Sequence, residues 1–245
     1  MTTDPRANLL RFFCVIVAHA AWAGYALAAT SQPATIQAAK PLPPALLPIT
    51  EDPALPRVLL IGDSISIGYT LPARARLGGV ANLIHAKDNC NDTSNGLKML
   101  DRWLGSGHWD VIHFNFGLHD LKYVADESAR DSKVRRQNIS VAQYEQNLEL
   151  IVQRLEKTGA KLIWCTTTPV PEGANARVEG EEQKYNEAAL RVMLQHKIPI
   201  DDLSSLAREH RAQWQLPHNV HFTADGYDAL GEQVAGSIKK ALETR

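Results

Sequence analysis

Beyond residue 56, short apolar runs alternate with longer amphipathic segments, and this alternation limits the folds that the chain can adopt. The runs have the length of buried strands, whereas the segments between them carry apolar residues three and four positions apart, as on one helix face. Such alternation is typical of a mostly parallel sheet that helices cover on both faces. The expected strands span residues 57–61, 80–84, 111–115, 161–166 and 198–201.

Four amphipathic segments predict helices that cover this sheet. Their stripes face a core and imply no function. With five strands, they predict a three-layer α/β/α sandwich with a flavodoxin-like sheet, in which ligands bind beside the carboxyl ends of the strands. The charge-rich run 126–136 is expected to be a solvated loop or helix face. The four stripes are Leu97, Leu100 and Leu104; Tyr144, Leu148, Ile151, Val152 and Leu155; Tyr185, Ala188, Ala189, Val192 and Met193; and Tyr227, Leu230, Val234 and Ile238.

The N-terminal residues have the pattern of an export signal. Arg6 and Arg11 precede an apolar run over residues 12–21, and small residues follow up to Ala28. This pattern predicts a signal peptide over residues 1–28. An uncleaved anchor is the alternative, although the run is short for a membrane span. Both place the domain outside the cytoplasm, secreted or periplasmic, and we expect no membrane contact after cleavage.

The remaining chain divides into an arm and one domain. Residues 29–56 are rich in Pro, Ala, Thr and Ser and show neither helical nor strand periodicity, which predicts a linker or a loosely packed arm. Residues 57–245 form the domain. Because Cys14 belongs to the signal, Cys90 and Cys165 remain, and they could pair outside the cytoplasm, although a lone pair sets no disulfide framework.

Charge and residue clustering argue against several partners. The chain has 26 Lys and Arg against 27 Asp and Glu, a formal net charge of -1, and no basic stripe. A nucleic-acid partner is therefore not expected. No group of His and Cys has the spacing of zinc ligands, so we expect no metal site.

Ser64 directly follows the first expected strand, in the sequence Gly62-Asp63-Ser64. A tight turn there can expose the serine hydroxyl and point its backbone N–H into a crevice. Alternatively, Ser64 caps the next helix, since serine is a favoured N-cap. A serine nucleophile needs a base, and His221, on a loop before the last helix, is the best-placed candidate. Taken alone, His221 is better explained as a surface loop residue.

The third expected strand supports the catalytic interpretation. It runs into residues 115–120, Asn-Phe-Gly-Leu-His-Asp. Gly117 provides a turn, His119 a side-chain donor and Asp120 a carboxylate, all at the sheet edge where Ser64 lies.

Together these blocks resemble the SGNH (GDSL-type) hydrolase family, over about residues 57–238. That family carries Gly-Asp-Ser after the first strand, a glycine loop after the second, Gly-x-Asn-Asp after the third and Asp-x-x-His near the end. The resemblance implies hydrolysis of acyl esters without a metal or cofactor. It also implies that Ser64 is the nucleophile and His221 the general base.

Two departures from the family pattern concern the oxyanion hole. His119 replaces the family's asparagine, and a neutral imidazole donates the one hydrogen bond that the role requires. A structural role for His119, bonded to a neighbouring loop, is the alternative. The glycine block has no glycine until Gly96, so the N–H of Asn91 is the candidate donor beside the N–H of Ser64.

The third departure concerns the carboxylate that orients the base. His218 stands where the family has its triad aspartate, three residues before His221. A dyad with Ser64, oriented by a backbone carbonyl, is the preferred interpretation. A carboxylate from elsewhere, such as Asp225, or a weakened enzyme are the alternatives.

Two aspartates are expected to support the site rather than react. Asp63 and Asp120 lie beside turns, where aspartate commonly accepts backbone N–H bonds. They would brace the nucleophile loop and the loop after the third strand.

An exported enzyme with a crevice at the sheet edge suits esters on polymers or sugars, so small acyl groups such as acetyl on carbohydrate are the expected substrate. Small-molecule esters fit the same chemistry. A lipase or phospholipase is one alternative, because the fold does not fix the substrate. A non-catalytic carbohydrate-binding protein that has lost the triad acid is another.

Overall fold

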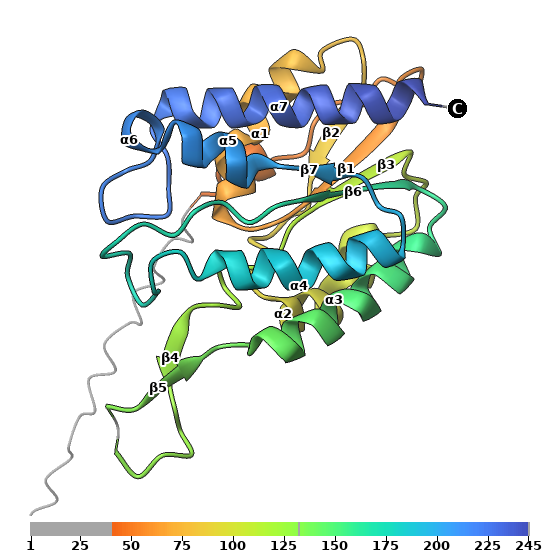
Figure 1. Cartoon of the computed structure of the whole chain (residues 1–245). Coiled ribbons are helices and arrows are strands. Elements are labelled where there is room, and N and C mark those ends of the chain that lie inside the picture. The colour runs from red at the N-terminus through yellow and green to blue at the C-terminus, as the bar shows by residue number, and fades with distance from the viewer. Residues whose placement is uncertain (1–40, 132, 245) are drawn as a thin grey trace, which may run out of the picture. The chain divides into compact units, whose positions relative to one another are not determined.

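The computed structural model describes residues 41–131 and 133–244. Its main sheet has five parallel strands in the order β2-β1-β3-β6-β7 (Figure 1). This confirms the predicted parallel sheet. The strands are β1 (Arg57–Ile61), β2 (Asn82–His85), β3 (Val111–Phe114), β6 (Lys161–Cys165) and β7 (Ile200–Asp201).

Helices cover both faces of the sheet, as predicted (Figure 1). On one face α1 packs on α7, and α5 and α6 also contact α7; on the other face α3 packs between α2 and α4. The four apolar stripes fall within α2, α3, α4 and α7. The helices are α1 (Ser64–Arg76), α2 (Thr93–Leu104), α3 (Val141–Glu156), α4 (Glu182–Gln195), α5 (Leu203–Glu209), α6 (Arg211–Trp214) and α7 (Ala224–Glu243).

Two strands begin later than predicted, because the residues before them close helices. The N–H groups of Val80 and Ala81 donate to the carbonyl of Leu77, just beyond α1. The N–H of Ile198 donates to the carbonyl of Met193 in α4. These apolar residues have the composition of strands but complete helix ends, where carbonyls otherwise lack partners.

An antiparallel hairpin, whose connecting loop contains most of the charge-rich run, was not predicted. It consists of β4 (Tyr123–Ala125) and β5 (Arg135–Gln137). Neither strand alternates apolar and polar residues, which is the pattern that identifies a strand. The hairpin is joined to the loop after β6 by a hydrogen bond of 2.7 Å from the N–H of Tyr123 to the carbonyl of Ala176.

The described end of the arm contacts the domain. Ala45 and Leu46, in the short 3-10 helix η1 (Pro44–Leu46), are buried, and Arg74 of α1 donates to the carbonyl of Ala45 at 3.1 Å. Asn82 of β2 exchanges hydrogen bonds with the backbone of Asp52. The predicted signal peptide and residues 29–40 of the arm lie outside the described residues.

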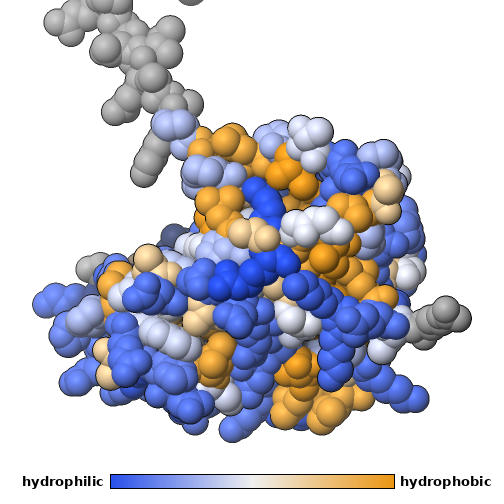
Figure 2. Space-filling view, turned by 90° about the horizontal axis from the view of Figure 1, so that it is seen from above, coloured by the Kyte–Doolittle hydropathy of each residue, from blue (hydrophilic) through white to orange (hydrophobic). Residues whose placement is uncertain are grey.

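Both cysteines of the domain, Cys90 and Cys165, are buried free thiols, so they do not form the disulfide that was considered. Burial raises the pKa of both thiols. Across the described chain, no helix is both long and apolar enough to cross a membrane. On the face shown in Figure 2, hydrophobic side chains are interspersed with hydrophilic ones.

His196, at the end of α4, makes part of the stability dependent on pH. Its ring nitrogens lie 2.9 Å from Glu149 and 2.9 Å from Glu156 of α3. Burial acts to lower the pKa of His196, but the two carboxylates outweigh it and raise the pKa. A raised pKa means that the imidazolium stabilises the fold below its ordinary pKa of about 6.5, and that this stabilisation is lost as the pH rises through the folded value.

Replacing His196 with glutamine should therefore lower the Tm more at pH 6 than at pH 9. Because the carboxylates are partly exposed, we expect a difference of about 2 °C. Thermal unfolding of both proteins at the two pH values measures it. Equal losses of Tm at pH 6 and pH 9 would contradict the charged contact.

Candidate active site

The turn between β1 and α1 exposes Ser64. The carboxylate of Asp63, not Ser64, caps α1: its Oδ1 accepts from the N–H of Ile65 at 2.9 Å. The hydroxyl of Ser64 is therefore not used as a helix cap. Gly62 permits the tight turn, because a Cβ there would come within 2.8 Å of Ser66 Oγ. The expectation that Asp63 braces this loop agrees with these contacts.

A second serine–histidine contact lies beneath the same turn. Ser66 Oγ is 2.6 Å from His85 Nε2 and donates to the carbonyl of Asp63 at 2.7 Å. Both side chains are buried, and burial lowers the pKa of His85 to about 4. This buried pair supports the backbone of the turn.

Ser64 and His221, although 157 positions apart, are in contact. Ser64 Oγ lies 2.8 Å from His221 Nε2, and both residues are half-buried. Two backbone hydrogen bonds hold the loop of His221. The carbonyl of His221 accepts from the N–H of Leu216, and the N–H of Thr223 donates to the carbonyl of Trp214. This distance allows the histidine to accept the serine proton.

Asn219 occupies the far side of the His221 ring. Asn219 Oδ1 lies 2.7 Å from His221 Nδ1 and also accepts the backbone N–H of His221 at 3.1 Å. Because a backbone N–H can only donate, the asparagine atom that faces both groups is the oxygen. Nδ1 must then carry the proton. Nε2 is left as an acceptor toward Ser64, which is the tautomer that a general base needs.

His218 does not take the place of the missing carboxylate. Its φ is +55°, and its Nδ1 faces the carbonyl of Glu172 at 2.9 Å. No described carboxylate forms a hydrogen bond with His221, and Asp225 lies in the first turn of α7. The ring is therefore oriented by a side-chain amide, which none of the three sequence alternatives included. The sequence feature that could have indicated this contact is Asn219 itself, because an asparagine two residues before His221 can bond the local backbone with its side chain.

The loop after β3 presents His119 at the same edge of the sheet. Gly117 has a φ of +154°, and a Cβ there would collide with Thr167 Oγ1, so only glycine fits. Asn138 Nδ2 donates to the carbonyl of His119 at 3.2 Å. The ring itself makes no hydrogen bond to a described residue. Burial lowers the pKa of His119, so its imidazole is neutral near pH 7 and has a free N–H.

Asn91 lies on the loop after β2 in a conformation that favours glycine. Its φ is +56°, and its N–H donates to Asn89 Oδ1 at 3.1 Å. The N–H of the preceding Cys90 donates to the carbonyl of Gly62, which places this loop beside the nucleophile turn. The N–H of Asn91 therefore lies on a loop beside the turn of Ser64, as an oxyanion donor would. It is bonded to the side chain of Asn89, which would have to turn away before an oxyanion could bind.

Asp120 joins two loops beneath the site. Its Oδ1 accepts from the N–H and the hydroxyl of Thr93, at 2.9 and 2.6 Å, at the start of α2. The carboxyl group is fully buried, and its Oδ2 has no hydrogen-bond partner among the described residues. Burial raises the pKa of Asp120 to about 7. These contacts agree with the expected bracing role.

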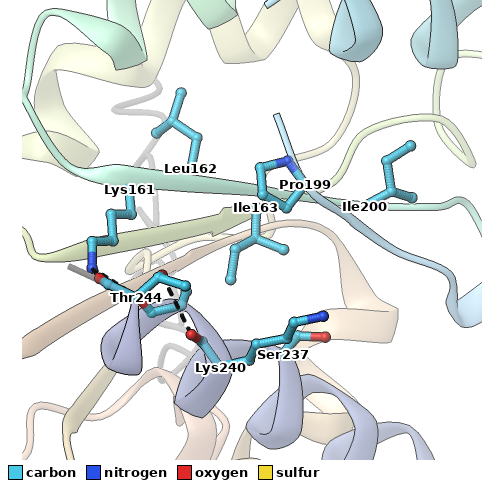
Figure 3. A pocket seen from close by; sticks show the side chains of 9 residues that line it. Lys161, Leu162, Ile163, Pro199, Ile200, Ser237, Lys240 and Thr244 are labelled. Atoms are coloured by element: carbon cyan, nitrogen blue, oxygen red, sulfur yellow. Dashed lines mark hydrogen bonds between the residues drawn. The ribbon is translucent and has the colours of Figure 1, made fainter. Parts of the chain in front are cut away.

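The described residues contain no group of three or more His, Cys, Asp or Glu side chains that could hold a metal ion. A cavity of about 440 Å³ lies at the other edge of the sheet, beside the first residues of β6 and the end of α7 (Figure 3). It is separated from Ser64 by the length of the strands. Its lining is Lys161, Leu162, Ile163, Pro199, Ile200, Ser237, Lys240, Ala241 and Thr244.

Comparisons with known proteins agree with this geometry. Residues 60–229 match the model of the GDSL-like lipase/acylhydrolase family. No curated protein matches the sequence.

Several solved structures share the fold. A lipase/acylhydrolase from Enterococcus faecalis is 21% identical, with a TM-score of 0.63, over 76% of this chain and 96% of that one. The acetyl xylan esterase AlAXEase is 16% identical, with a TM-score of 0.59, over 74% and 99%. An α/β hydrolase enzyme from the metagenome of Lake Arreo, Spain, is 17% identical, with a TM-score of 0.58, over 77% and 97%. By its family match and its fold, the chain belongs to the GDSL-like lipase/acylhydrolase family and is an ester-hydrolysing enzyme.

Proposed function

We propose that this protein is an exported serine esterase that removes small acyl groups, such as acetyl, from carbohydrate. The observation that carries the catalytic part is the chain of contacts from Ser64 through His221 to Asn219, at 2.8 and 2.7 Å. The substrate is supported by the likeness to an acetyl xylan esterase and by the export signal expected over residues 1–28.

The reaction follows from this geometry. Ser64 Oγ attacks the ester carbonyl while His221 Nε2 takes the hydroxyl proton, giving a tetrahedral oxyanion. His221 then protonates the leaving alcohol, and the acyl group remains on Ser64. Water, deprotonated by His221, attacks this acyl-enzyme and releases the acid. Asn219 holds the imidazole through both steps but carries no charge to stabilise the imidazolium.

The oxyanion is proposed to bind between the N–H of Ser64 and the ring N–H of His119, with the N–H of Asn91 as the third donor once Asn89 turns away. The neutral, unbonded ring of His119 supports this role, because a donor already bonded within the protein could not serve. Because the N–H of Asn91 is bonded to the side chain of Asn89, the oxyanion hole gains this third donor only when substrate binding displaces that side chain.

Replacing His119 with alanine should lower kcat by about 10²-fold, the usual cost of removing one oxyanion donor. The variant His119→Asn, which restores the family's donor, should recover most of that loss. Steady-state kinetics with p-nitrophenyl acetate measure both. A kcat for His119→Ala within a factor of two of the wild-type value would show that the ring is structural.

The chain-length preference tests the substrate class. With p-nitrophenyl esters from acetate to dodecanoate, we expect kcat/KM to be highest for acetate. The highest value for a long acyl chain would support a lipase or phospholipase instead. Hydrolysis at the background rate for every ester would favour the non-catalytic carbohydrate-binding protein, which oligosaccharide binding without turnover would then identify.

A further inference from the structure

Arg177, on the loop after β6, is a half-buried cation without an ion-pair partner among the described residues. Its Nε donates to the carbonyl of Leu118 at 2.9 Å, and its Nη1 donates to the carbonyl of Asn175 at 3.1 Å. The nearest glutamates along the chain are engaged elsewhere: Glu179 pairs with Arg211, and Glu181 lies 3.7 Å from the ammonium of Lys184. Neutral carbonyls therefore hold the guanidinium without cancelling its charge.

The backbone fixes this arginine in place. Ala176 has a φ of +53°, a left-handed conformation that residues other than glycine rarely adopt. The carbonyl of Ala176 accepts the N–H of Tyr123, and the N–H of Arg177 donates to the carbonyl of Ala174. A strained residue held by such contacts is common where a loop presents a ligand-binding group.

The guanidinium lies beside the proposed oxyanion site. Its partner Leu118 directly precedes His119, and Leu118 and Asp63 line one small cavity under the nucleophile turn. Burial lowers the pKa of Arg177 while the charge of Asp63 raises it, and the charge of Arg177 in turn helps to lower the pKa of His119. Arg177, His119 and the turn of Ser64 therefore face one region.

The other charges of this region do not neutralise Arg177 directly. Asp63 accepts from the first turn of α1, and Asp92 accepts from Asn95 and Asn138. Lys122 adds a second positive charge near His119. The remaining N–H groups of the Arg177 guanidinium have no acceptor among the described residues, so they are free to bind an anion beside the loop of His119.

We propose that Arg177 binds a carboxylate on the alcohol side of the ester, so that the preferred substrate is an acyl ester of an acidic sugar such as a uronic acid. This inference rests on the proposed function. A small acyl group such as acetyl carries no charge, so the anion must belong to the alcohol. The planar guanidinium matches the geometry of a carboxylate, and its fixed position reduces the entropy lost on binding.

The test compares substrates that differ only in this charge. The 3- and 4-acetoxybenzoates are each paired with their neutral methyl esters, and kcat/KM is measured for the wild type, Arg177→Gln and Arg177→Lys. The ratio of anionic to neutral kcat/KM is compared between enzymes, which cancels the intrinsic reactivity of the esters. For at least one pair, Arg177→Gln should lower this ratio about tenfold, and Arg177→Lys should lower it less.

Arg136→Gln is the matched control, because Arg136 is also held by two carbonyls but lies exposed on the hairpin. It should leave the ratio unchanged. An equal loss on charged and neutral esters in Arg177→Gln would show that Arg177 only positions the loop of His119 and would overturn the inference, as would an unchanged ratio. The proposed function fails separately, if the wild type hydrolyses neither ester of a pair above background.

Discussion

Replacing Ser64 with alanine is expected to reduce kcat by about 10⁴-fold or more, to the level that binding and the oxyanion donors alone provide. The alanine variant has no hydroxyl to attack the carbonyl, so no acyl-enzyme forms. His221→Ala should cost about as much, because without a base the hydroxyl remains protonated. The double variant should be no worse than either single one, since the two side chains act as a unit across their 2.8 Å contact.

The measurement is the release of p-nitrophenol from the acetate ester, with thermal unfolding to show that each variant folds. Ser106→Ala is the matched control, because Ser106 is an exposed serine before β3, at the other edge of the sheet. It should retain wild-type kcat. Background-level rates in both the wild type and Ser64→Ala would exclude catalysis of this ester, and losses that add in the double variant would contradict a coupled pair.

Removing the amide of Asn219 is expected to have the second-largest effect. In Asn219→Ala, Nδ1 of His221 loses its acceptor, so the ring can rotate and its Nε2 no longer faces Ser64 as an unprotonated acceptor. We expect kcat to fall by about 10²-fold or more, with KM changing little, because the loss concerns orientation of the base rather than substrate binding.

Asn219→Asp separates orientation from charge. The carboxylate should keep the ring in place and stabilise the imidazolium, so kcat should equal or exceed the wild-type value. Its negative charge should also favour the imidazolium, so the acid limb of the pH–rate profile should move to higher pH. An Asn219→Ala variant with wild-type kcat and an unmoved profile would mean that another group orients His221.

Much of the fold could be predicted because its signals are local. The apolar run that became β1 and the spacing of apolar residues in α3 and α7 are visible in short windows, and each element buries the side that its pattern marks. The hairpin could not be predicted in this way. Its strands are short and polar, and they are held by pairing with each other and by the contact with Ala176.

The residues of the site likewise fall into those that short motifs predicted and those that only the folded loops revealed. Ser64, His119 and His221 could be proposed from short motifs in a particular order, and the contact between Ser64 and His221 agrees with that proposal. By motif spacing, His218 stands where the residue that orients the base is expected. In the structure, His218 turns toward the carbonyl of Glu172, and Asn219 contacts His221 instead. The positive φ of His218 sets which of the two neighbouring side chains reaches His221, and this backbone angle cannot be deduced from motif spacing.

By itself the sequence determined the layers, the order of the motifs and the chemistry available at the carboxyl edge of the sheet, because hydrophobic periodicity and residue type are properties of short segments. Only the tertiary structure decided which amide orients His221, that Asn89 covers the N–H of Asn91, and that Arg177 stands beside His119 without a carboxylate. These features depend on where separate loops meet, and the direction of a side chain in a loop is set by backbone angles and long-range hydrogen bonds.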